Sequence, residues 1–149
     1  ACEGVPVMKS FFFVVSVCAL MATSSLAQES VEISKLPFSA ARRAGGTLYI
    51  SGQIARTADG KDAKESVAAE THQIMKNLGH ILSENGYTYD DLVNVTVWLS
   101  DIEDYHEMNR AYASYFDKQF PARACVGGAQ IVFGFKVEIA AIAYKDEKQ

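Results

Sequence analysis

The sequence predicts an α+β domain in which a mixed β-sheet carries two helices on one face. Two segments repeat apolar residues at helical spacing, and five others are rich in β-branched and aromatic residues. No internal repeat, linker or low-complexity tract divides the chain. Together these observations favour one folding unit that contains both kinds of secondary structure.

The first expected element is a β-hairpin made by residues 38–44 and 47–54. The second of these segments alternates in polarity and is rich in residues that favour strands. Gly45 and Gly46 lie between the two segments and give a turn signal. We therefore expect the two segments to pair with each other.

Two amphipathic helices are expected further along the chain. Apolar residues recur every three or four positions over residues 67–82, after a polar loop. Ser66 or Asp62 can cap the start of this helix, and Gly86 ends it. The second helix is expected over residues 104–119, where aromatic residues lie along one face.

Three further strands are expected, over residues 92–100, 125–131 and 137–144. The last of them is almost wholly apolar, which predicts burial on both of its faces. A sheet with both helices on one face leaves its other face apolar, and exposed patches of that size mark interfaces. The sequence therefore predicts that the domain forms an oligomer.

The first 27 residues are expected to lie outside this domain. Met8 and Lys9 lead into an apolar run over residues 11–22, and small residues follow up to Ala27. This order is typical of a secretory signal peptide cut before Gln28, and residues 1–7 read as an upstream remnant. We expect residues 28–149 to form the single domain, exported to the periplasm or secreted, with no membrane segment after cleavage.

Composition narrows the possible functions. Removing 27 of the 149 residues leaves 122, and the net charge stays at −4 because one Glu and one Lys are lost. An acidic chain without a Lys/Arg cluster is poorly suited to nucleic acid, so no nucleic-acid partner is expected.

Cys125 is the one cysteine left after cleavage, which excludes an internal disulfide and favours a structural thiol. The three histidines show no metal-ligand spacing, so neither a metal nor a cofactor is expected.

Arg123 is the candidate binding residue with the clearest chemistry. It follows Pro121 in a short connection that leads into a strand. The planar guanidinium can give two parallel hydrogen bonds to a small carboxylate, which a lysine cannot. The position therefore points to a carboxylate-bearing ligand.

Four blocks of sequence carry a resemblance to a known family: residues 48–54 (LYISGQI), 109–116 (NRAYASYF), 120–126 (FPARACV) and 136–143 (KVEIAAIA). In this order, over about residues 36–144, the chain resembles the reactive-intermediate deaminase family known as RidA or YjgF. The resemblance implies a chorismate-mutase-like fold and a homotrimer with three ligand clefts between subunits.

The resemblance also implies roles for individual residues. Arg123 matches the arginine that holds the substrate carboxylate, and Cys125 matches a neighbour whose backbone lines the cleft. Ser51 and Gly52 match hairpin positions that face the site, and Asn109 matches a polar helix position at its border. Phe38 falls where many members carry a tyrosine, so the ring is kept and the hydroxyl is lost.

One position departs from the family pattern. Ala140 stands where active members usually have a glutamate that orders the attacking water. Glu138 is two residues earlier and so points to the same face of the strand, displaced by roughly 6 to 7 Å. Glu138 is therefore the candidate for a substitute catalytic role beside Arg123.

The expected activity is hydrolytic deamination of reactive 2-imino or enamine acids to 2-oxo acids and ammonia. Such imines hydrolyse spontaneously in water. A site that anchors the carboxylate and positions a water can therefore supply much of the rate enhancement over the spontaneous reaction. The alternative is a secreted trimer of the same family that binds small carboxylates, or acts as a chaperone, without turnover. Ala140 favours this alternative, and Arg123 favours the enzyme.

Overall fold

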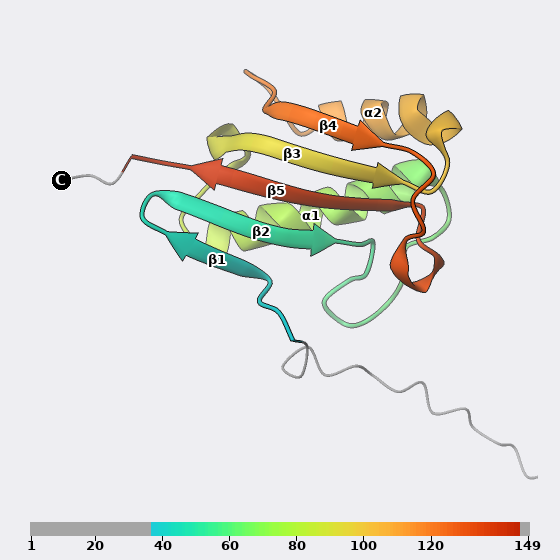
Figure 1. Cartoon of the computed structure of the whole chain (residues 1–149), viewed down its shortest axis with the longest axis horizontal. Coiled ribbons are helices and arrows are strands. Elements are labelled where there is room, and N and C mark those ends of the chain that lie inside the picture. The colour runs from blue at the N-terminus through green and yellow to red at the C-terminus, as the bar shows by residue number, and fades with distance from the viewer. Residues whose placement is uncertain (1–36, 147–149) are drawn as a thin grey trace, which may run out of the picture.

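A computed structural model describes residues 37–146, so the expected leader over residues 1–27 lies outside the described residues. The strands are β1 (Ala41–Ala44), β2 (Thr47–Gln53), β3 (Leu92–Leu99), β4 (Ala122–Val126) and β5 (Val137–Tyr144), and the helices are α1 (Val67–Glu84) and α2 (Tyr105–Ala113). The strands form one sheet in the order β1-β2-β5-β3-β4 (Figure 1). Both helices lie behind this sheet in Figure 1. The predicted α+β class with a mixed sheet is confirmed.

Strand pairing follows from the two helical crossovers. β5 lies at the centre and pairs antiparallel with β2 and with β3. β3 and β4 are parallel and are joined through α2, because parallel neighbours need a crossover connection. No helix among residues 37–146 is long and apolar enough to span a bilayer.

Local signals in the sequence set the ends of α1. The Ser66 side chain accepts a hydrogen bond from the backbone N–H of Ala69, so Ser66 is the N-cap. Asp62, the other candidate, instead pairs with Arg56 at 2.7 Å. Gly86 has φ +82°, a left-handed conformation that ends the helix without a side-chain penalty.

The second helix and the strand after it differ from the prediction. α2 ends at Ala113 instead of residue 119, because Tyr115 N–H and Phe116 N–H donate to the carbonyls three residues earlier and tighten the chain into a turn. The strand predicted over residues 125–131 is β4, at 122–126. Gly128, at φ +76°, turns the chain out of the sheet just after it.

The two faces of β5 differ. Val137, Ile139, Ala141 and Ala143 are buried beneath the helices. Glu138, Ala140 and Ile142 alternate with them and are half-buried, and Tyr144 is exposed. The predicted burial on both faces is therefore wrong for one copy of the chain, since only the helix face is closed. We call the other side, which no described helix covers, the open face.

A buried carboxylate ties α1 to the start of β5. Glu70 is 1% exposed, and its Oε2 accepts hydrogen bonds from the backbone N–H groups of Lys136 (2.8 Å) and Val137 (3.0 Å). Burial raises the pKa of this carboxyl, and the two N–H bonds act in the opposite direction. Glu70 thus holds in place the end of β5 that carries Glu138.

Candidate functional site

Arg123 lies on the helix face of the sheet. It pairs with Val95 of β3, whose side chain is buried in the core between sheet and helices. Its Nη2 donates a hydrogen bond to Asn109 Oδ1 of α2 at 2.6 Å. The structure therefore brings together two of the predicted binding residues, from β4 and α2.

Three further side chains of α2 surround this guanidinium. Its Cζ lies 4.8 Å from the ring centroid of Tyr112 and 5.9 Å from that of Tyr105, while Nη1 lies 4.0 Å from Met108 Sδ. Sequence reasoning missed these three residues. The signal was present, because positions 105, 108, 109 and 112 follow the helical spacing that places residues on one face.

The charge of Arg123 has no carboxylate partner among residues 37–146. An arginine has five N–H donors, and here one donates to Asn109 and another faces the weak sulfur acceptor of Met108. Three donors remain, enough for the two parallel hydrogen bonds that a carboxylate accepts. The half-buried guanidinium is thus suited to an anionic ligand.

Cys125 lies on the same face of β4, two residues after Arg123. It pairs with the buried Val97 and packs at the margin of the core. Burial raises the pKa of the Cys125 thiol, and the nearby Arg123 charge opposes this rise. Since the thiolate is the reactive form, this environment fits the predicted structural role for the side chain.

Glu138 lies on the open face, over Gly52. A Cβ placed on Gly52 would lie 2.0 Å from Glu138 Oε1, so the carboxylate rests directly on the glycine backbone. Burial raises the pKa of this carboxyl, and Glu138 has no hydrogen bond or ion pair with any residue in the described part of the chain. A half-buried carboxylate without a compensating partner is a candidate for a proton-transfer role.

A β-bulge brings the hairpin to this carboxylate. Ile50 pairs with Ala141 and Gln53 with Ile139, so Ser51 and Gly52 together oppose the single Ala140. The Glu138 carboxylate therefore lies over the bulge that faces Ala140.

The other hairpin residues take structural positions. Ser51 Oγ donates a hydrogen bond to the carbonyl of Ser39 at 2.7 Å, which fixes the segment before β1. Phe38, the residue before Ser39, precedes β1 instead of starting it and is 59% exposed. Its ring is available on the surface beside the hairpin.

The predicted site residues fall into two groups in one copy of the chain. Arg123, Asn109 and Cys125 lie on the helix face, whereas Glu138 pairs with Trp98, three residues beyond Val95 on β3. Since side chains alternate along a strand, Arg123 and Glu138 leave the sheet on opposite faces, with β3 between their strands. One copy therefore does not bring the two side chains to a common ligand.

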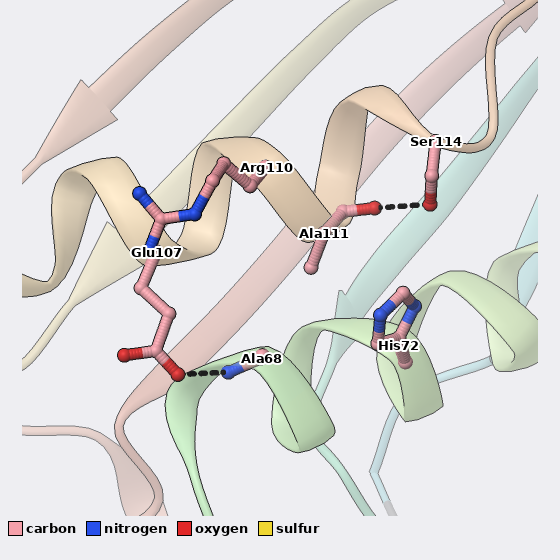
Figure 2. A pocket seen from close by; sticks show the side chains of 6 residues that line it. All are labelled: Ala68, His72, Glu107, Arg110, Ala111 and Ser114. Atoms are coloured by element: carbon pink, nitrogen blue, oxygen red, sulfur yellow. Dashed lines mark hydrogen bonds between the residues drawn. The ribbon is translucent and has the colours of Figure 1, made fainter.

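A hollow of about 410 Å³ lies between the two helices. Figure 2 shows Glu107 reaching from α2 to α1, where its Oε1 accepts a hydrogen bond from the backbone N–H of Ala68. His72, Arg110, Ala111 and Ser114 complete the lining, and none of the predicted site residues takes part. Within residues 37–146 no group of three His, Cys, Asp or Glu side chains is placed to hold a metal ion.

Comparison with known proteins gives consistent similarities. The family profile described as "Endoribonuclease L-PSP" matches residues 30–145. A RutC family protein of Pyrococcus horikoshii is 39% identical over 111 residues, which cover 74% of this chain and 88% of the relative. The human protein named 2-iminobutanoate/2-iminopropanoate deaminase is 37% identical, over 80% of this chain and 92% of its own.

The fold is similar to solved structures as well. The crystal structure of a putative endoribonuclease from Thermotoga maritima matches with a TM-score of 0.73 and 31% identity. The match covers 76% of this chain and 91% of that one. The described sheet and helices thus have a counterpart over nearly the whole of that chain.

Proposed function

Since the chain belongs to the endoribonuclease L-PSP family, also called the RidA family, we propose that it hydrolyses 2-imino acids to 2-oxo acids and ammonia. The observation that carries the proposal is the Arg123 guanidinium, held by α2 without a carboxylate partner in the described chain. The substrate carboxylate would accept two hydrogen bonds from the remaining N–H donors of Arg123. The similarity to the human deaminase supports the choice of an imine as the reacting group.

The proposed reaction is a simple hydrolysis that needs few protein groups. Water adds across the C=N bond, with its oxygen bonding to the carbon and one of its protons passing to the nitrogen. The C–N bond of the resulting carbinolamine then breaks as the hydroxyl proton also passes to the nitrogen, which gives the 2-oxo acid and ammonia. Glu138 is the group we assign to hold that water and accept its proton, because burial raises its carboxyl pKa towards the range of a useful base. No cofactor enters this reaction.

We assign the complete site to two copies of the chain. Arg123 and Glu138 lie on opposite faces of one sheet, so a common ligand needs Arg123 from one copy and Glu138 from another. The open face, with exposed Tyr49 and Tyr144 beside half-buried Ile142, offers an apolar surface for such association. A homotrimer with a cleft at each interface is the arrangement that we propose.

A second candidate function is binding of a small carboxylate without turnover. Ala140 favours it, because the resemblance implies a glutamate at this position in active members and an alanine cannot act as a base. In this case Arg123 would bind 2-oxo acids, and no variant of Glu138 would change the rate of imine loss. The two candidates share the binding step and differ only in hydrolysis.

The test uses 2-iminobutanoate formed in situ from threonine by a dehydratase, with semicarbazide trapping the imine that escapes hydrolysis. Added protein should lower the trapped fraction. Arg123→Ala should raise KM about 10- to 150-fold, the range for a lost charge-assisted hydrogen-bond pair of roughly 1.5 to 3 kcal/mol. Arg110→Ala, on the exposed side of α2, is the matched control and should leave the rate unchanged. A wild-type protein that leaves the trapped fraction unaltered refutes the enzyme and leaves the binding candidate.

We also propose export, on the strength of the signal-like segment before Gln28. Mass spectrometry of the protein recovered from its own cells tests this directly. An N-terminus at Gln28 supports export, whereas a mature chain that retains residues 11–22 refutes it.

A further inference from the structure

The guanidinium of Arg123 is held by a cradle that consists of Tyr105, Met108, Asn109 and Tyr112, all on one face of α2. Asn109 fixes one N–H at 2.6 Å, and Tyr112 offers its ring at 4.8 Å from Cζ. A cation within about 6 Å of an aromatic centroid is attracted by the ring quadrupole. Because the ring carries no net charge, this contact orients the cation and leaves its charge available.

Arg56 shows the contrasting arrangement in the same chain. Its Cζ lies 4.7 Å from the ring centroid of Phe133, a cation–π contact similar to that of Arg123. Its Nε and Nη2 also donate to the two carboxylate oxygens of Asp62, at 2.7 and 3.2 Å. The donors of Arg56 are therefore already paired with a carboxylate, whereas Arg123 has no carboxylate partner among residues 37–146 and keeps three N–H donors for a ligand.

The ring and the hydroxyl of Tyr112 contribute differently to its packing. The residue is 3% exposed, and its hydroxyl is buried without a hydrogen-bond partner among residues 37–146. Burying an unpaired hydroxyl is unfavourable, so the hydroxyl does not explain the stability of this packing. The stabilising contacts of Tyr112 come from its ring, which lies 4.8 Å from Arg123 Cζ and 4.8 Å from the ring centroid of Phe116.

We propose that Tyr112, assisted by Tyr105, is a positioning residue that orients the Arg123 guanidinium for the carboxylate of the ligand. The inference rests on the proposed use of Arg123 and assigns the effect to the aromatic face of Tyr112. Without that face the guanidinium keeps its charge and its Asn109 bond but samples other rotamers. The consequence is weaker binding of the carboxylate, with the hydrolytic step itself unaffected.

The experiment compares Tyr112→Leu with Tyr112→Phe in the full chain. Leucine removes the π face, and we expect KM for 2-iminobutanoate to rise about 10-fold with kcat unchanged, as expected for loss of a desolvated cation–π contact. Phenylalanine keeps the face and removes the unpaired hydroxyl, so it should preserve KM and kcat. In an Arg123→Ala background, Tyr112→Leu should add no further increase in KM, because its effect passes through Arg123.

A second measurement separates this inference from the proposed activity. Titration of each variant with 2-oxobutanoate, followed by NMR, gives the Kd of an inert carboxylate whether or not the protein turns over. A wild-type protein that binds 2-oxobutanoate without hydrolysing imine, with a Kd raised about 10-fold by Tyr112→Leu, refutes the enzyme and supports the cradle. Equal Kd values for Tyr112→Leu and wild type overturn the proposed role of the cradle. It is also overturned if Tyr112→Phe binds 2-oxobutanoate as weakly as Tyr112→Leu does. Should Tyr112→Leu fail to fold, Tyr105→Leu takes its place, with a smaller rise in Kd supporting the cradle and an unchanged Kd overturning it.

Discussion

Replacement of Gly52 by alanine tests the catalytic assignment of Glu138 without substituting Glu138 itself. The added Cβ would lie 2.0 Å from Glu138 Oε1 and 2.9 Å from its Cδ. Because Cβ contacts shorter than about 3.0 Å are not tolerated, the carboxylate oxygen must move by at least about 1 Å. The displaced atoms belong to the end of a flexible side chain, so the backbone of β2 and β5 can stay in place.

A misplacement of about 1 Å in a catalytic group can cost about 10²-fold in rate. We therefore expect Gly52→Ala to lower kcat for 2-iminobutanoate by this order, while the urea midpoint of unfolding changes little. The loss should appear in kcat, since Arg123 still binds the carboxylate. Steady-state rates with trapping of the imine, together with urea unfolding, measure both quantities.

Gly46→Ala is the matched control, because its Cβ would lie 2.1 Å from the backbone oxygen of Lys145. A backbone carbonyl cannot swing away, so this variant should lose stability and keep its rate per folded molecule. In a Glu138→Gln background, Gly52→Ala should have no further effect on kcat. Full activity of Gly52→Ala in a protein whose Glu138 carboxylate has moved would refute the catalytic assignment.

Three further predictions concern neighbouring features. Ala140→Glu should restore hydrolysis to the Glu138→Gln variant, because both positions face the Ser51–Gly52 bulge; a double variant as slow as Glu138→Gln contradicts this. Glu70→Gln should flatten the pH dependence of stability measured by urea unfolding. The pKa of Glu70 is raised in the folded protein. Its contribution to the free energy of unfolding is therefore fully present below the ordinary carboxyl pKa and is lost as pH rises through the raised value. Identical pH profiles of stability for wild type and Glu70→Gln would contradict this prediction. Light scattering on residues 28–149 at micromolar concentration should give the mass of a trimer, and a monomer mass would exclude the two-copy site.

Local signals in the sequence were sufficient for most of the elements. The 3.6-residue period located α1, the Ser66 hydroxyl and Gly86 marked its ends, and the chemistry of arginine singled out Arg123. These features depend on residues that are close in the chain, so their patterns are readable without knowledge of the fold. The end of α2 was missed because i+3 hydrogen bonds after Ala113, which leave no mark in the apolar pattern, replaced the helix.

The tertiary structure alone decided which site residues meet. Glu138 and Arg123 were both expected at the site, but their positions on opposite faces follow from the pairing of Arg123 with Val95 and of Glu138 with Trp98. The contact between Glu138 and Gly52 depends likewise on a one-residue bulge between β2 and β5. A shift of one residue in register moves every side chain of a strand to the other face, and register is set by contacts between segments distant in sequence. The sequence by itself therefore determined the elements and the chemistry of single residues, and long-range pairing determined which of those residues can share a ligand.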